Sequence, residues 1–236
     1  MSITCIVQAR MGSIRLPGKV MMMLDDKNPI LSYVISQLQH CKSIEKIIVA
    51  TTDLKEDDTI EVFTNNFKID CFRGNSKDVL DRYYQCAKKF SISTIVRITA
   101  DNPLIDPTLI ENVIQKFQSG NFDYISNAHI RSFPYGTEIE IFSFHALEQA
   151  WKNSKMDYDR EHVTPYFYNN SEIFRTYDII HTENISNLRW TIDTIEDLKL
   201  VRIIVSKIDK RPILMTDILE LINKEPELVK INSNSV

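Results

Sequence analysis

A short basic segment near the N-terminus carries the residue types that bind phosphate. The sequence QARMGSIRLPGK (8–19) places Arg10, Arg15 and Lys19 among two glycines and a serine, and the first 24 residues contain no acid. Glycines let backbone N–H groups approach an anion, and the cations offset its charge at close range. The segment follows a strand-like run, Ile3 to Gln8, and open α/β sheets bind ligands beyond the carboxyl ends of their strands. We therefore predict a polyphosphate-binding loop.

Spacing excludes two common phosphate-binding loops. A Walker loop has four residues between its glycines and a Ser or Thr after its lysine. Here five residues separate Gly12 from Gly18, and Val20 follows Lys19. The dinucleotide pattern G-x-G-x-x-G is also absent from the sequence. A basic surface loop without a ligand is the alternative, and the position directly after a buried strand argues against it.

Two aspartates follow strand-like segments and have the chemistry to hold Mg²⁺. Asp101 comes just after TIVRIT (94–99), and Asp193 lies in WTIDT (190–194). Mg²⁺ usually binds one or two carboxylates together with substrate phosphates. The alternatives are a turn residue for Asp101 and a helix-start residue for Asp193. Asp106 and Asp197 are better explained as helix-cap and first-turn residues.

Alternating strand-like and helix-like segments position these side chains. The predicted strands are residues 3–8, 46–51, 69–72 and 94–99. Helices are predicted at 58–65 and 78–90 and over two apolar stripes, 30–38 and 109–117, that follow the cap-plus-proline pairs Asn28-Pro29 and Asp106-Pro107. Four βα repeats predict a mainly parallel sheet with helices on both faces.

The second half of the chain departs from this alternation. Thr137 to Phe142 alternates polar and apolar residues, which suggests a half-exposed antiparallel strand at a sheet edge. Leu188 to Ile192 is predicted as a late strand, and Thr194 to Asp197 resembles a capping box that opens a helix. We expect one domain over residues 1–225 and a mobile polar tail over residues 226–236.

Composition limits the classes of partner. The chain has 236 residues with 28 Lys+Arg and 32 Asp+Glu, a net charge of −4, which disfavours a nucleic-acid partner. No apolar run approaches the roughly 18 residues that a membrane span requires, so we expect no membrane partner and a cytoplasmic location. The four cysteines are scattered without metal-ligand spacing, which predicts buried thiols in a reducing compartment.

The sequence resembles the sugar cytidylyltransferases: CMP-Kdo synthetase, CMP-sialic acid synthetase and, most closely, the spore-coat polysaccharide type. The loop QARMGSIRLPGK resembles their nucleotide-binding signature, and similar stretches follow in order: FRGNSKDVLDRYY (72–84), VRITADNPLIDP (96–107), EIEIFSFHALEQAW (138–151), REHVTPY (160–166) and LRWTIDTIEDL (188–198). The resemblance implies an α/β Rossmann-like nucleotidyltransferase fold. This fold has a mainly parallel mixed sheet flanked by helices and a small antiparallel dimerisation extension, and the proteins are usually homodimers. CTP is the implied nucleotide and Mg²⁺ the implied cofactor.

The resemblance also implies roles for the nucleotide side of the site. Arg73, Gly74 and Ser76 would read the cytosine or support its loop, although a surface ion pair is an equal alternative for Arg73. Asp101 and Asp193 would be the Mg²⁺ ligands. The loop residues implied to bind the nucleotide are Gln8, Ala9, Arg10, Gly12, Ser13, Arg15 and Lys19. Attack of a sugar hydroxyl on the α-phosphate of CTP needs positioning and charge neutralisation, so Arg10, Arg15, Lys19 and Asp101 are the catalytic candidates.

The acceptor side is implied by two further segments. Related enzymes contact the sugar at the segment that here carries Tyr135, Gly136, Glu138 and Glu140, and many close relatives have Asp where this chain has Tyr135 or Glu138. The polar cluster at 160–164, with Arg160 and His162, could reach the acceptor, and a capping or ion-pair role is the equal alternative. His162 has the pKa range of a general base, but a lone histidine is usually structural.

These expectations describe an enzyme that transfers CMP from CTP to a sugar acid or related glycan precursor and releases pyrophosphate. One alternative is a nucleotidyltransferase that uses another nucleotide and a sugar phosphate. A different class of alternative, a non-catalytic nucleotide-binding protein, would be expected to have lost the loop lysine or the aspartates, and all are present.

Overall fold

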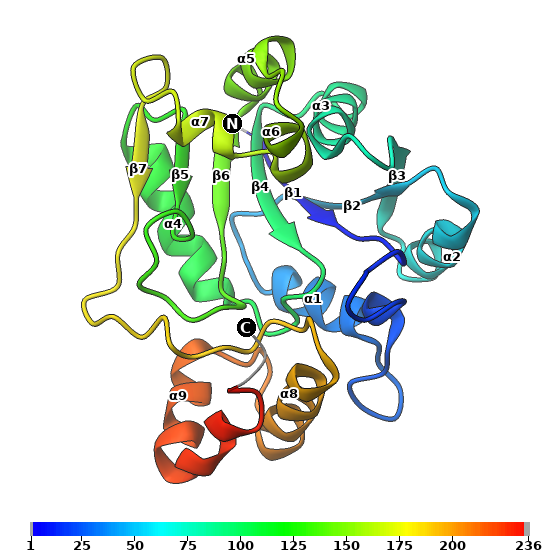
Figure 1. Ribbon diagram of the computed structural model, residues 1–236, viewed down its shortest axis with the longest axis vertical. Helices are drawn as coiled ribbons and strands as arrows, with labels where there is room; N and C mark the ends of the chain where they lie inside the picture. The colour runs from blue at the N-terminus through cyan, green and yellow to red at the C-terminus, as the bar shows by residue number, and fades with distance from the viewer. Residues whose placement is uncertain (1, 234–236) are drawn as a thin grey trace.

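One seven-stranded sheet forms the centre of the molecule, in the order β3-β2-β1-β4-β6-β5-β7 (Figure 1). The structure is a computed structural model that describes residues 2–233. Every strand pairing is parallel except the two that β6 makes with β4 and β5. The strands are β1 (Ile3–Gln8), β2 (Lys46–Thr52), β3 (Asp70–Gly74), β4 (Thr94–Thr99), β5 (Tyr124–Ser126), β6 (Glu140–Ser143) and β7 (Thr176–Asp178). The predicted α/β fold with a mainly parallel mixed sheet is therefore confirmed.

Helices cover both faces of the sheet. One face packs against α1 (Ile30–Gln39), α2 (Asp58–Asn66) and α4 (Pro107–Ser119). The other packs against α3 (Val79–Lys89), α5 (Phe144–Asn153) and α7 (Pro165–Tyr168). Successive strand residues point to opposite faces, so in β1 Val7 joins the first core and Ile6 the second. The chain therefore has a buried layer on each side of the sheet.

Helices α8 (Ile195–Lys207) and α9 (Met215–Lys224) lie next to the sheet (Figure 1). They contribute to a third apolar cluster that includes the fully buried Trp190. The remaining helical elements are α6 (Asp157–His162) and the short 3-10 helices Lys19–Met21, Lys55–Asp57 and Pro226–Lys230. No helix among residues 2–233 combines the length and apolar character needed to span a membrane.

Several predicted boundaries are confirmed by the hydrogen bonds that create them. Strands β1 and β4 have the predicted bounds. Asp78 caps α3 by accepting the Asp81 N–H, and Asp106 caps α4 by accepting the Thr108 and Leu109 N–H groups. Thr194 and Asp197 form the predicted capping box of α8.

The start of α1 differs from the prediction by one residue. Pro29 is the cap and Ile30 the first helical residue, whereas Asn28 had been expected to cap the helix. Asn28 is already engaged, because its backbone N–H donates to Asp25 Oδ1 at 2.7 Å and its side-chain amide donates to the same carboxylate. The Asp25 carboxylate thus closes a turn before the helix begins.

Two strand predictions in the second half of the chain need correction. β6 is antiparallel, as predicted, but it lies inside the sheet between β4 and β5, and Glu140, Ile141 and Phe142 are all buried. The polar residue Glu140 therefore does not mark a solvent-exposed face, and its charge is compensated by Arg97. Residues 188–192 form no regular strand, since their backbone bonds to the Tyr135 and Asp101 carbonyls instead of to a neighbouring strand.

The C-terminal segment is packed, contrary to the predicted mobile tail. Residues 226–230 form a 3-10 helix whose Leu228 is buried, and Asn232 is only 6% exposed. The polar sequence was misleading because Leu228 joins the third apolar cluster and Asn232 pairs with buried polar groups. The last residues of that predicted tail, 234–236, lie outside the described residues.

The cysteines are free thiols. Cys5, Cys41 and Cys86 are buried as expected, whereas Cys71 is only partly buried, contrary to the expectation. Burial raises the pKa of Cys41 and of Cys86 to about 12, so both stay protonated at neutral pH.

Arg82 on α3 leads to a prediction about stability. Its side chain is fully buried, and within residues 2–233 none of its three guanidinium nitrogens has a hydrogen-bond partner. Burial lowers the pKa of Arg82, which shows the cost of keeping this charge from water. We expect Arg82→Met to raise the free energy of unfolding of the ligand-free protein by about 1 kcal/mol or more.

Urea unfolding at neutral pH measures this change. Leu80→Ala, at a buried apolar position of the same helix, is the control and should lose about 2–5 kcal/mol through the cavity it leaves. A less stable Arg82→Met protein would contradict the prediction.

Candidate active site

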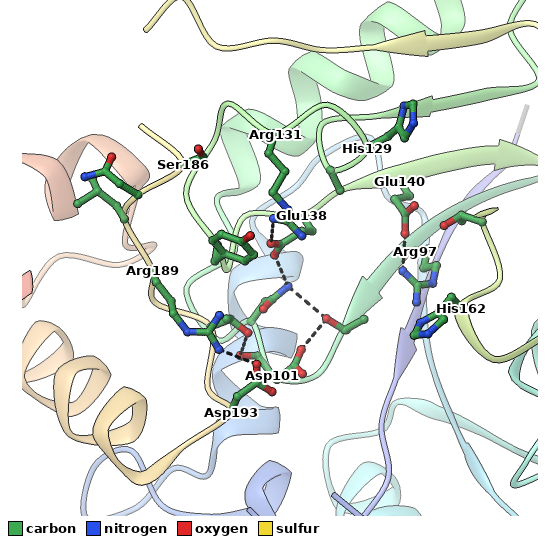
Figure 2. Close-up of a pocket in the computed structure, with 18 of the residues that line it drawn as sticks. Arg97, Asp101, His129, Arg131, Glu138, Glu140, His162, Ser186, Arg189 and Asp193 are labelled. Atoms are coloured by element: carbon green, nitrogen blue, oxygen red, sulfur yellow. Dashed lines mark hydrogen bonds and ion pairs between the residues drawn. The ribbon is translucent and has the colours of Figure 1, made fainter. Parts of the chain in front are cut away.

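Two adjoining cavities, of about 350 and 830 Å³, lie at the carboxyl ends of β1 and β4. The first loop lines much of the smaller one. The larger one is bordered by the segments after β5, before β6 and before α8 (Figure 2). Six residues line both: Arg15, Arg97, Thr99, Asp101, His162 and Asp193. Groups bound in the two cavities would therefore meet at these side chains, which we call the junction.

The ammonium group of Lys19 joins the two predicted aspartates. Its Nζ lies 2.8 Å from Asp101 Oδ2 and 2.9 Å from Asp193 Oδ1, and it donates to the Ile192 carbonyl at 2.7 Å. Burial by itself lowers the pKa of Lys19, but the two carboxylates outweigh it and hold the pKa above its ordinary value. Lys19 therefore remains charged, and Asp101 and Asp193 converge on one cation.

Both aspartates are oriented by further contacts. Thr99 Oγ1 donates to Asp101 Oδ1 at 2.6 Å. Asp193 receives Arg189 Nη2 on Oδ2 at 2.6 Å and Arg15 Nη2 on Oδ1 at 3.0 Å. Burial alone would raise the pKa of Asp193, but Lys19 and the two arginines outweigh it and lower the pKa. Asp193 is thus an ionised carboxylate held by three cations.

The first loop presents its cations to the smaller cavity. Its backbone is anchored by the Met11 N–H, which donates to the buried Asp57 carboxylate at 2.6 Å. Gly18 has a φ of 71°, a left-handed conformation that suits glycine, and directly precedes the 3-10 helix that begins at Lys19. Arg10 forms no ion pair within the described chain. The loop therefore has one arginine free to meet an anion.

The structure brings together five of the seven predicted loop residues. The smaller cavity is lined by Gln8, Arg10, Ser13, Arg15 and Lys19. Ala9 is buried behind them, and its N–H donates to the Ala50 carbonyl. Gly12 lines neither cavity and packs near Glu56 instead.

Arg73, Gly74 and Ser76 do not line either cavity. Arg73 pairs with Asp58 and Glu61 and donates to two backbone carbonyls, which is the ion-pair alternative that the sequence left open. A contact between these three residues and a cytosine base stays a prediction.

Most of the predicted acceptor residues line the larger cavity, but Arg160 does not. Tyr135, Glu138, Glu140 and His162 line the larger cavity, and Gly136 lies between two of them with a φ of 105°. Arg160 is directed elsewhere, because it pairs with Asp78 and donates to the carbonyls of Trp151 and Ser154. For Arg160 the structure again shows the ion-pair alternative.

Two arginines that the sequence did not single out hold two of the carboxylates predicted to contact the acceptor (Figure 2). Arg131 pairs with Glu138 at 2.7 Å and lies 3.9 Å from the centre of the Tyr135 ring. Arg97 pairs with Glu140 on the neighbouring strand. Burial alone would lower the pKa of Arg97, but Glu140 together with Tyr83 and Tyr124 outweighs it and raises the pKa. Only Arg97 gave a sequence signal, as the one charged residue in the strand TIVRIT.

Comparison with known proteins identifies the family of this chain. The sequence profile described as "Cytidylyltransferase" matches residues 4–228. Uncharacterized protein MJ1063 of Methanocaldococcus jannaschii is 42% identical over 99% of this chain and 96% of its own length. Spore coat polysaccharide biosynthesis protein SpsF of Bacillus subtilis is 32% identical over 94% of each chain.

A solved structure described as a cytidylyltransferase from Leptospira borgpetersenii has a TM-score of 0.93 and 33% identity to this chain, and the match covers 97% of both chains. The matches extend across the whole fold, not only the first loop. The chain therefore belongs to the cytidylyltransferase family, whose members are nucleotidyltransferase enzymes.

Proposed function

We propose that this enzyme transfers CMP from CTP to a sugar acid or related glycan precursor and releases pyrophosphate. The observation that carries the proposal lies at the junction, where Lys19 from the smaller cavity contacts Asp101 and Asp193, which line both cavities. A transfer reaction needs such a boundary, because the donor phosphate and the acceptor hydroxyl must approach each other in a fixed orientation.

The smaller cavity suits the triphosphate of CTP. Arg10 and Ser13 belong to the loop that lines it, and Arg15 and Lys19 place two further cations at the junction. Cations held in advance at this position would offset the charge that develops on the phosphates as pyrophosphate leaves. No protein nucleophile is required, since the acceptor hydroxyl attacks the α-phosphate directly.

Mg²⁺ is the proposed cofactor, and Asp101 and Asp193 are the residues that would hold it. The Lys19 ammonium already lies within 3 Å of both carboxylates, so the pair is arranged around a single cation. Among residues 2–233 no group of three His, Cys, Asp or Glu side chains is arranged to bind a metal. Mg²⁺ commonly completes its shell with phosphates and water, so two carboxylates suffice. When bound, Mg²⁺ would neutralise phosphate charge during the transfer.

The larger cavity suits a polyhydroxylated acceptor with little net charge. Its lining has four arginines (Arg15, Arg97, Arg131 and Arg189) and four carboxylates (Asp101, Glu138, Glu140 and Asp193). This balance provides both donors and acceptors for hydroxyl groups. It favours a sugar acid with one carboxylate over the sugar phosphate of the alternative reaction, which brings more negative charge. A homodimeric assembly and a cytoplasmic location complete the proposal and rest on the family resemblance.

A pyrophosphate-release assay tests the function. The protein is incubated with Mg²⁺, one of CTP, UTP, GTP or ATP, and a panel of sugar acids and sugar 1-phosphates, and products are identified by mass. We expect pyrophosphate and a CMP-linked product with CTP and a sugar acid. Turnover only with a sugar 1-phosphate, or only with another nucleotide, would support the alternative reaction.

The two aspartates provide the sharper test of the site. We expect Asp101→Asn and Asp193→Asn each to lower turnover about 100-fold or more, because each removes a carboxylate that would hold the Mg²⁺ whose charge stabilises the transferring phosphate. Asp70→Asn is the matched control, since Asp70 pairs with Lys46 at the start of β3 and lines neither cavity. Circular dichroism checks folding. Near-normal turnover of both variants at limiting Mg²⁺ would refute the assignment.

Lys19→Met separates the lysine's structural role from metal binding. Removal of the ammonium leaves the two carboxylates facing each other, so we expect the ligand-free variant to lose about 3 kcal/mol or more. A divalent cation can replace that charge, so Mg²⁺ should raise the Tm of Lys19→Met more than that of the wild type. Lys46→Met, which removes an exposed ion pair, should respond to Mg²⁺ like the wild type. Equal Mg²⁺ responses in all three proteins would contradict the prediction.

A further inference from the structure

The C-terminal segment, residues 226–233, forms part of the wall of the larger cavity. Val229, Asn232 and Ser233 are among the residues that line it. Leu228 anchors the segment in the apolar cluster formed with α8 and α9. The segment therefore reaches the candidate active site from a fixed base.

Asn232 connects this segment to the polar groups behind the junction. Its side-chain amide Nδ2 donates to Asp197 Oδ1 at 2.8 Å and to the Arg189 carbonyl at 3.1 Å. Asn232 is 6% exposed and Asp197 is fully buried, so water competes little for these bonds.

The Asp197 carboxylate also accepts hydrogen bonds from Arg189 and from the backbone of Asp193. Its Oδ1 also accepts Arg189 Nε at 3.1 Å, and its Oδ2 accepts the backbone N–H of Asp193 at 3.0 Å. Asp197 therefore holds the backbone of Asp193 directly and holds the guanidinium group that reaches the Asp193 side chain.

Arg189 completes the chain of contacts. Its Nη2 donates to Asp193 Oδ2 at 2.6 Å, which leaves Asp193 Oδ1 facing Lys19 at 2.9 Å. One oxygen of Asp193 is thus fixed from behind while the other points toward Asp101 and the shared cation position. The orientation depends on where Arg189 and the Asp193 backbone are held.

We propose that Asn232 is a positioning residue for metal and nucleotide binding, acting through Asp197 and Arg189 on the carboxylate of Asp193. This inference rests on the proposed function, because it requires Asp193 to hold the divalent cation. Hydrogen-bond partners behind a metal ligand fix its orientation, and their loss typically weakens metal affinity or activity about 10–100-fold. The amide is the appropriate group at this position, since a carboxylate there would face Asp197 and repel it.

The test uses the full chain with Mn²⁺ and CTP as probes, and calorimetry measures CTP affinity with Mn²⁺ and, separately, in EDTA. We expect Asn232→Ala to weaken Mn²⁺-dependent CTP binding about 10-fold and to leave the EDTA value near that of the wild type. Asn232→Asp should weaken Mn²⁺-dependent CTP binding further. Asn223→Ala, the same substitution at an exposed position of α9, is the matched control.

A purely structural role would give a different pattern. Thermal unfolding without ligand reports stability, and a lower Tm combined with wild-type Mn²⁺-dependent CTP binding would overturn the inference. Equal weakening in EDTA and in Mn²⁺ would overturn it as well, because the effect would then not depend on the cation. A wild-type protein that binds neither CTP nor Mn²⁺ would refute the proposed function and this inference with it, so the two failures can be told apart.

Discussion

The contact between the Lys19 ammonium and the carboxylates of Asp101 and Asp193 is the constraint on which the site depends. Asp101 follows Lys19 by 82 positions in the sequence, and Asp193 follows it by 174. A buried ammonium without these carboxylates would carry an uncompensated charge, and without the ammonium Asp101 would lose the cation that it pairs with. The first loop, the end of β4 and the segment before α8 must therefore be assembled together.

Without a ligand the site neutralises its own charges. Arg15 and Arg189 pair with Asp193, Arg131 pairs with Glu138, and Arg97 pairs with Glu140. In the proposed reaction, substrate binding would be an exchange of partners at cations that are already in place. Such exchange limits the affinity gained from each new ion pair with the substrate. The existing ion pairs, however, keep the cations oriented before the substrate binds.

Local signals in the sequence predict the first half of the fold well. The bounds of β1 and β4 and the cap at Asp106 follow from adjacent residues, and the structure confirms them. The loop cations and Asp101 follow strand ends, as predicted, and Asp193 lies beside them although no regular strand directly precedes it. The direction in which a long side chain points cannot be predicted from such local signals, because it depends on partners distant in the sequence.

Arg73 and Arg160 illustrate that limit. Both are arginines in stretches that resemble the family, yet Arg73 pairs with residues of α2 and Arg160 pairs with Asp78, 82 positions away. Asn232 shows the converse, because nothing in a polar C-terminal sequence indicates a buried partner such as Asp197. Spacing identifies which residues have suitable chemistry, but tertiary contacts decide which of them face the cavities.

The reversed direction of β6 explains why the residues proposed to bind the acceptor precede a strand, whereas those proposed to bind the nucleotide follow one. Parallel strands β1 and β4 end at the cavities, so the loop after Gln8 and the residues after Thr99 line them. β6 runs the other way, and Glu140 at its start pairs in register with Arg97 of β4. The segment just before β6, with Tyr135 and Glu138, therefore lies at the same edge of the sheet. A parallel β6 would have placed it at the opposite edge, away from the junction.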